Sequence, residues 1–196
     1  MNFRIEYLLN SFSRWQHLLL DPKKEWKAIA QEKTNMKSIF IQFAFPVVAI
    51  CSLLSFIGVL IHTGSISNSI SQLVVSFISL NLGFYTVGKM IELLAPNFQL
   101  QIKLSTIYQL IIYSGAVFCL FHGLAKLFSP YSFLNQICLV FELYFIRVLW
   151  LGISQLLNIS ENKKPGFTIV VSLLILVLPL IFERMFSVIF KLPVTI

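Results

Sequence analysis

Residues 38 to 62 read SIFIQFAFPVVAICSLLSFIGVLIH and contain no acidic residue, lysine or arginine. This run exceeds the ~20 helical residues that cross the hydrocarbon core of a bilayer. Further apolar segments follow at residues 70 to 95, 105 to 128, 133 to 157 and 167 to 190. The pattern predicts an all-α polytopic membrane protein, a bundle of five transmembrane helices.

The composition agrees with a chain that lies largely in a bilayer. Of the 196 residues, 57% are hydrophobic and only 12% are charged, which is far from the composition of a soluble domain. The apolar segments occupy nearly everything after Lys37, so no stretch is large enough for a separate catalytic domain. We therefore divide the chain into two amphipathic interfacial helices, residues 1–36, and a five-helix transmembrane domain, residues 37–196.

The net charge of +7 is concentrated before the first span. The basic residues there are Arg4, Arg14, Lys23, Lys24, Lys27, Lys33 and Lys37. Lys103, Lys163 and Lys164 fall on the same side after later crossings, whereas residues 62 to 69 carry no lysine or arginine. The positive-inside rule then predicts a cytoplasmic amino terminus and an external carboxyl terminus. We expect the membrane to be a bacterial inner membrane.

Two amphipathic helices are predicted ahead of the first span. In residues 3 to 20 the apolar side chains share one helical face; they are Ile5, Leu8, Leu9, Phe12, Trp15 and Leu19. Asp21 and Pro22 are typical of a helix cap and first helical position, and they open a second helix. The candidate contacts with the lipid surface are Arg14, Trp15, Lys23, Lys24, Trp26 and Lys27.

The expected partners of these helices are anionic headgroups of the cytoplasmic leaflet. Each lysine or arginine near such a surface contributes roughly 1 kcal/mol. Two alternatives stay open: the basic residues only set the topology, or the helices form a docking surface for a protein partner. The pattern is also compatible with a homo-oligomer. No nucleic-acid-binding module is recognisable, so no nucleic-acid partner is expected.

Polar residues inside the predicted spans are the candidate intramembrane site, because a charge at the bilayer centre costs at least ~2.5 to 3.5 kcal/mol. Glu142 and Arg147 lie in span four, Glu183 and Arg184 in span five, and Asn81 in span two. At ~1.5 Å rise per residue, Glu142 and Arg184 lie at similar depths, which predicts that they pair across spans four and five. These residues either hold the two spans together or line a polar pathway for a proton, an ion or a small solute.

Small residues predict where the spans pack against one another. Gly115, Cys119 and Gly123 recur at every fourth position in span three, and Ser79 and Gly83 do so in span two. Small residues at this spacing let transmembrane helices approach closely. We expect both stripes to be helix contacts.

No catalytic constellation is recognisable in the chain. His17, His62 and His122 fall on three separate segments, and there is no HExxH pattern, glycine-rich phosphate loop or nucleophile elbow. We therefore expect no enzymatic activity, no cofactor and no metal site.

Three stretches of the chain carry a family resemblance. The first is DPKKEWKAI at residues 21 to 29, followed by FAFP at 43 to 46. The second runs from Leu104 and Ser105 through Gln109 and Leu110 to Tyr113 and Ser114, and the third is LYF at 143 to 145, leading to KKPGF at 163 to 167. In this order they resemble the entry into the first span, the third span, and the fourth span with its exit towards the fifth in bacterial members of the Yip1 family. The resemblance implies five helices and a cytoplasmic amino terminus. Eukaryotic members act in vesicle traffic and associate with Rab GTPases, whereas bacterial members have no settled activity.

Two functions compete at this point. The first is a non-enzymatic integral membrane protein of the Yip1 type, with an adaptor or membrane-organising role carried by the basic amphipathic helices. The second is a small transporter or channel that uses Glu142, Arg147, Glu183 and Arg184. A transporter requires these charges to face a wet path, whereas an adaptor requires only paired charges and a solid bundle.

Overall fold

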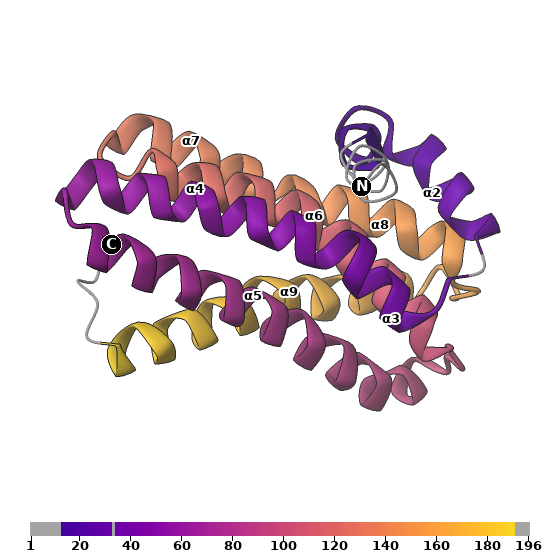
Figure 1. Ribbon diagram of the computed structural model, residues 1–196. Helices are drawn as coiled ribbons and strands as arrows, with labels where there is room; N and C mark the ends of the chain where they lie inside the picture. The colour runs from indigo at the N-terminus through magenta and orange to yellow at the C-terminus, as the bar shows by residue number, and fades with distance from the viewer. Residues whose placement is uncertain (1–12, 33, 191–196) are drawn as a thin grey trace, which may run out of the picture.

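The computed structural model describes residues 13–32 and 34–190, and its regular elements there are all helical (Figure 1). Five helical segments are long and apolar enough to cross a membrane: Met36–Thr63, Ile66–Phe98, Leu104–Leu127, Ser132–Leu156 and Lys164–Ile189. The predicted all-α bundle of five transmembrane helices is therefore confirmed. The predicted apolar face of Ile5, Leu8, Leu9 and Phe12 lies outside the described residues.

The helices follow one another in an up-and-down order. A helix at residues 13–20 precedes α2 (Pro22–Gln31). Span one comprises α3 (Met36–Ile39), the π-helical turn η1 (Phe40–Ala44) and α4 (Phe45–Thr63). Span two comprises α5 (Ile66–Leu94) and the short 3₁₀ helix η2 (Ala95–Phe98), and span three is α6 (Leu104–Leu127). Span four comprises α7 (Ser132–Glu142) and α8 (Tyr144–Leu156), and span five is α9 (Lys164–Ile189).

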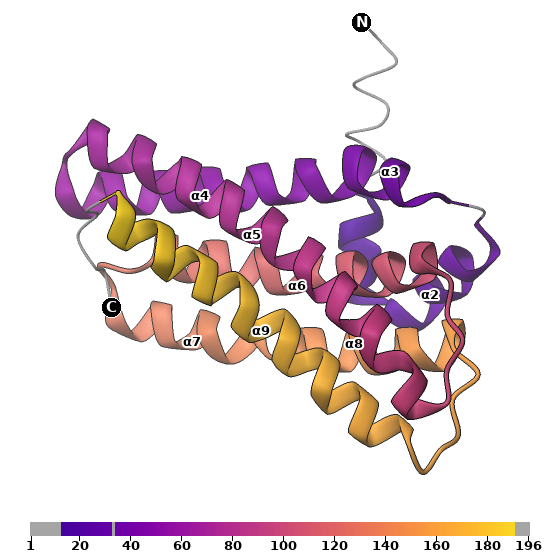
Figure 2. The same cartoon turned by 90° about the horizontal axis from the view of Figure 1, so that it is seen from below.

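We call the two ends of the bundle proximal and distal. At the proximal end, span one begins with Met36 and α8 ends at Leu156. At the distal end, α4 ends at Thr63 and α6 ends at Leu127. The helix of residues 13–20 and α2 lie beside α8 towards the proximal end (Figures 1 and 2).

Span one departs from a regular α-helix just before its proline. The Phe45 N–H donates to the Phe40 carbonyl, a five-residue bond that widens the helix at η1. Pro46 follows directly, and a proline has no N–H with which to continue the regular four-residue pattern. The π-helical turn is therefore the local adjustment by which this helix passes its proline.

Span four is divided at Leu143, where an uninterrupted segment was expected. The Leu143 N–H donates to the Val140 carbonyl at 3.2 Å, and the Leu143 carbonyl accepts from the Ile146 N–H at 3.0 Å. Both are three-residue bonds of the 3₁₀ kind, which tighten the helix for one turn. The interruption comes immediately after Glu142, whose side chain is buried.

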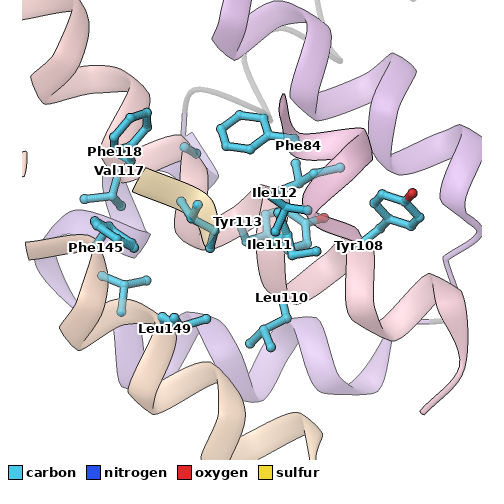
Figure 3. Close-up of a cluster of buried hydrophobic side chains, with 14 of the residues drawn as sticks. Phe84, Tyr108, Leu110, Ile111, Ile112, Tyr113, Val117, Phe118, Phe145 and Leu149 are labelled. Carbon is cyan, nitrogen blue, oxygen red and sulfur yellow. The ribbon is translucent and has the colours of Figure 1, made fainter. Parts of the chain in front are cut away.

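The core of the protein is centred on α6. In the most apolar part of each span, 72% of α6 is buried inside the protein, compared with 33% of α9. Figure 3 shows Phe84, Phe145 and Leu149 from neighbouring helices gathered around the α6 side chains. Phe118 of α6 packs edge-on against Phe145, with ring centroids 5.8 Å apart. The other spans therefore surround α6, and their outer faces carry the exposed apolar side chains.

The two stripes of small residues are helix contacts, as predicted. A Cβ atom added to Gly83 would lie 2.7 Å from Pro179 Cγ, so α5 and α9 touch at this position. One added to Gly123 would lie 3.1 Å from Cys51 Sγ, and one added to Gly115 would lie 2.7 Å from the Phe84 ring. Figure 2 shows α5 and α9 running side by side along the bundle.

Candidate functional site

A group of buried polar side chains joins four helices near the distal end. Its centre is Glu183 of α9, which accepts hydrogen bonds from Gln72 Nε2 at 2.7 Å and Ser76 Oγ at 3.1 Å, both on α5. Lys126 of α6 also donates to Glu183 through a short charged contact. The Glu183 carboxylate thus has several donors even though it is buried.

His122 of α6 extends this group to span four. Its Nε2 lies 3.3 Å from Glu183 Oε2, and its Nδ1 lies 3.5 Å from Glu142 Oε1. The contact with Glu142 is electrostatic, because its geometry does not meet hydrogen-bond criteria and Nδ1 has no hydrogen-bond partner among the described residues. The imidazole ring also stacks on Phe118, with ring centroids 5.3 Å apart. We call Gln72, Ser76, His122, Lys126, Glu142 and Glu183 the distal polar cluster.

The charges of the distal polar cluster can balance. In their ionised forms Glu142 and Glu183 contribute two negative charges, and Lys126 contributes one positive charge. A protonated imidazole has an N–H on each ring nitrogen and carries a positive charge, which suits a ring placed between two carboxylates. With His122 in that form the cluster is neutral, so its burial does not leave an unpaired charge in the membrane.

The predicted pair of Glu142 and Arg184 is wrong. Arg184 is exposed, whereas Glu142 and Glu183 are buried. The reason is the rotation of α9: successive residues of a helix point about 100° apart, so Glu183 faces inwards and Arg184 faces outwards. Arg147 is also exposed and lies over the Tyr144 ring, 5.7 Å from its centroid.

Four members of the distal polar cluster were not predicted from the sequence: Gln72, Ser76, His122 and Lys126. A usable signal was present, because His122 and Lys126 are four residues apart and therefore share one face of a helix. Gln72 and Ser76 have the same spacing on α5. Polar pairs at this spacing in two apolar helices point to a shared polar contact.

Asn81, the remaining member of the predicted intramembrane site, is not part of the distal polar cluster. Its side-chain nitrogen donates to the Phe77 carbonyl of the same helix at 2.8 Å. Its side-chain oxygen is buried and has no hydrogen-bond partner in the part of the chain that the structure describes. Asn81 instead borders an apolar groove between spans one and two.

The helix of residues 13–20 and α2 are attached to the bundle by two tryptophans. Trp26 is 0% exposed, and its indole N–H donates to the Val148 carbonyl of α8 at 2.8 Å. Trp15 is 3% exposed and donates to the Ala116 carbonyl of α6 at 2.9 Å. Both residues contact protein, which corrects the predicted lipid contacts of Trp15 and Trp26. An apolar helical face indicates burial, but it does not say whether lipid or protein covers it.

Arg14 is likewise held within the protein. Its guanidinium contacts Glu25 at 3.2 Å, forms a short two-pronged contact with Glu32 and donates to the Tyr113 hydroxyl at 3.0 Å. The hydrogen bonds to Glu32 raise the pKa of Arg14 above its ordinary value. The arginine thus links both ends of α2 to α6 and does not point towards a lipid surface.

The lysines of α2 are placed differently. Lys23, Lys24 and Lys27 are exposed, whereas Trp26 and Ile29 of the same helix are fully buried. Asp21 caps the helix by accepting from the Lys24 N–H at 3.2 Å. The predicted role of these lysines as lipid contacts stays a prediction, and their exposure is compatible with it.

The fold, the apolar outer faces and the buried polar cluster define a polytopic helical membrane protein. A comparison with family models matches residues 17–182 to the Yip1 domain, which covers most of the chain. The protein belongs to the Yip1 family, and the resemblance noted from the sequence is confirmed. No curated protein and no solved structure matches the chain significantly.

Proposed function

We propose that this Yip1-family protein is a non-enzymatic membrane-organising adaptor whose working surface is the lysine face of α2. The protein resides in a bacterial inner membrane with its proximal end in the cytoplasm. The observation that carries the proposal is the burial of Trp26, which fixes α2 to α8 and leaves Lys23, Lys24 and Lys27 outward. A basic surface that the bundle holds in a fixed position is suited to binding anionic partners at the membrane.

Anionic headgroups are the partners that this surface fits best. Three lysines at roughly 1 kcal/mol each favour an anionic surface by about 3 kcal/mol, or on the order of a hundredfold in affinity. The attraction is screened within about 10 Å at 0.1 M salt. Because α2 needs no folding step to present its lysines, little ordering entropy opposes the binding.

The interior of the bundle also supports the adaptor role. The buried charged residues of the described chain are Glu25, Glu142, Lys164 and Glu183, and each lies within salt-bridge distance of a basic or acidic partner. Paired charges inside a well-packed bundle are what cohesion between helices requires. An adaptor requires no other role for these buried charged residues.

The test compares two double substitutions in the full-length protein, reconstituted in bilayers that contain a spin-labelled anionic or zwitterionic lipid. Lys23→Gln with Lys27→Gln removes charge from α2, while Lys103→Gln with Lys163→Gln removes the same charge elsewhere at the proximal end. We expect the α2 variant to lower the preference for anionic lipid several-fold more than the control does. An equal loss in both variants contradicts the special role of α2.

A transporter is the second candidate, and the distal polar cluster is the observation that favours it. Gln72, Glu183, His122 and Glu142 form a continuous series of polar contacts across the bundle. The 3₁₀ turn at Leu143 stands beside Glu142, and such interruptions often occur where helices move. Proteoliposomes containing a pH-sensitive dye test this function: proton flux that Glu142→Gln abolishes, while the protein stays folded, establishes the transporter and overturns the adaptor.

A further inference from the structure

An apolar groove of about 800 Å³ lies between the beginning of span one and the middle of span two. Its first wall comes from η1 and α4, with Phe40, Ile41 and Phe45. Its second wall comes from α5, with Phe77, Ile78 and Leu82. Figures 1 and 2 show α4 and α5 close at the distal end and separating towards the proximal end, where α3 lies.

Aromatic contacts join the two walls of the groove to each other and to α6. Phe45 packs against Phe40 and against Phe77, with ring centroids 6.2 Å apart in both pairs. Behind them, Tyr108 of α6 contacts Phe40 at 5.3 Å and donates its hydroxyl to the Tyr85 carbonyl at 3.0 Å. The walls thus rest on a third helix, so the groove belongs to the packed structure and does not depend on a loop.

The groove is open on the side that faces the hydrocarbon of the bilayer. Ile41 is 53% exposed and Ile78 is 42% exposed, on opposite walls. Along α5 the lining runs from Phe77 to Tyr85, which is about 12 Å at the helical rise. Its volume lies in the range of ~300 to 1,000 Å³ that small-molecule sites occupy.

One cation stands in the lining, at the proximal mouth. Lys37 of α3 borders the groove, is exposed, and has no acidic partner in the described ranges 13–32 and 34–190. A lysine at the end of a span extends its ammonium to the level of the headgroups. The groove therefore combines an apolar surface, which suits a lipid tail, with a positive charge at one end.

We propose that this groove binds one anionic phospholipid, with an acyl chain along Phe45 and Ile78 and the phosphate beside Lys37. A phospholipid has the same order of groups, a charged head followed by a long apolar tail. The lysine supplies the preference for a net negative headgroup, and the aromatic walls supply the apolar surface for the tail. The groove does not include α2, so lipid binding in the groove can be tested separately from the adaptor function.

The experiment uses native mass spectrometry of the full-length protein, released from bilayers of equal parts phosphatidylglycerol and phosphatidylethanolamine. We expect one retained lipid per protein, enriched several-fold in phosphatidylglycerol. Leu82→Trp fills the groove and should remove most of the adduct. Ile70→Trp, on an exposed position of the same helix outside the groove, should leave it unchanged.

Lys37→Gln tests the contribution of the headgroup separately from that of the acyl chain. This variant should still retain a lipid but with little preference between the two headgroups. If Leu82→Trp destabilises the protein, Phe45→Trp provides a second readout, because brominated phosphatidylglycerol should quench the added fluorescence more strongly than brominated phosphatidylethanolamine. The proposal is overturned if the protein retains no lipid, if Leu82→Trp leaves the amount of retained lipid unchanged, or if both lipids are retained equally. It is also overturned if the protein is released as a dimer without lipid, because a second copy would then be the occupant of the groove.

Discussion

Trp26 of α2 and Val148 of α8 are joined by an indole N–H to carbonyl hydrogen bond of 2.8 Å that spans 122 positions of the chain. The bond lies in a close contact, because a Cβ atom on Gly152, one turn further along α8, would lie 2.6 Å from the Trp26 ring. A segment that its composition alone places on the membrane surface is therefore part of the core.

Gly152→Ala should detach α2 from α8. The added methyl group overlaps the Trp26 ring, and overpacking of this kind typically costs ~1 to 3 kcal/mol. We expect a lower melting temperature in detergent and faster tryptic cleavage at the α2 lysines. Gly166→Ala is the matched control, since its added Cβ finds only Phe98 at 3.7 Å and should have little effect.

Glu183→Gln should destabilise the bundle by roughly 3 to 5 kcal/mol, because it leaves Lys126 without its counter-charge in a largely buried place. Combining it with Lys126→Met should recover part of the loss. Thermal unfolding in detergent measures both effects. Arg184→Gln, at the neighbouring exposed position, serves as the control; a loss there as large as that of Glu183→Gln would contradict the structure.

Glu142→Gln should have a smaller effect than Glu183→Gln. Glu142 contacts His122 at 3.5 Å, whereas Glu183 has hydrogen bonds from Gln72 and Ser76 as well as its charged partners. The same unfolding measurement ranks the two substitutions. The reverse order would show that the contact between span four and His122 is the stronger one.

Arg14→Lys should loosen the N-terminal attachment by about 1 to 3 kcal/mol despite keeping the charge. The guanidinium contacts Glu25, Glu32 and Tyr113 simultaneously, and an ammonium does not reproduce this planar set of donors. Hydrogen exchange of α2 measures the loosening. Lys24→Arg, on the exposed side of α2, should leave exchange unchanged.

The orientation of the bundle can be tested with single cysteines in a background without Cys51, Cys119 and Cys138. Ser67 and Asn162 lie at opposite ends of the bundle and are exposed. An impermeant thiol reagent added to intact cells should label Ser67→Cys and not Asn162→Cys. Labelling in the opposite pattern would place the proximal end outside the cell.

Apolar length was sufficient to predict the five spans, because a bilayer sets a minimum length that few soluble helices share. The gaps between spans also follow the sequence closely, as with Thr63 and Ile66 around the first turn. The interruption at Leu143 was not predictable in this way, since neither proline nor glycine stands there. It comes directly after Glu142, whose buried side chain lies 3.5 Å from His122 of another helix.

The candidate site could be predicted only in part. Glu142 and Glu183 were selected from the sequence as ionisable residues within the spans, and both are buried. Depth arithmetic then compared Glu142 with Arg184, but it does not specify how each helix is rotated. It therefore assigned Arg184 as the partner in place of His122. The histidine was considered only as a catalytic or metal-binding residue, and its position between two carboxylates became visible only when three helices were placed together.

The distal polar cluster also has a consequence for biosynthesis. Glu183 lies on span five, whereas His122 and Lys126 lie on span three, so these charges are matched only after α9 has been placed beside α6. Until then α6 carries a lysine and a histidine that no later carboxylate except Glu142 can neutralise. Insertion of α9 is therefore the step that completes the charge balance around His122 and Lys126.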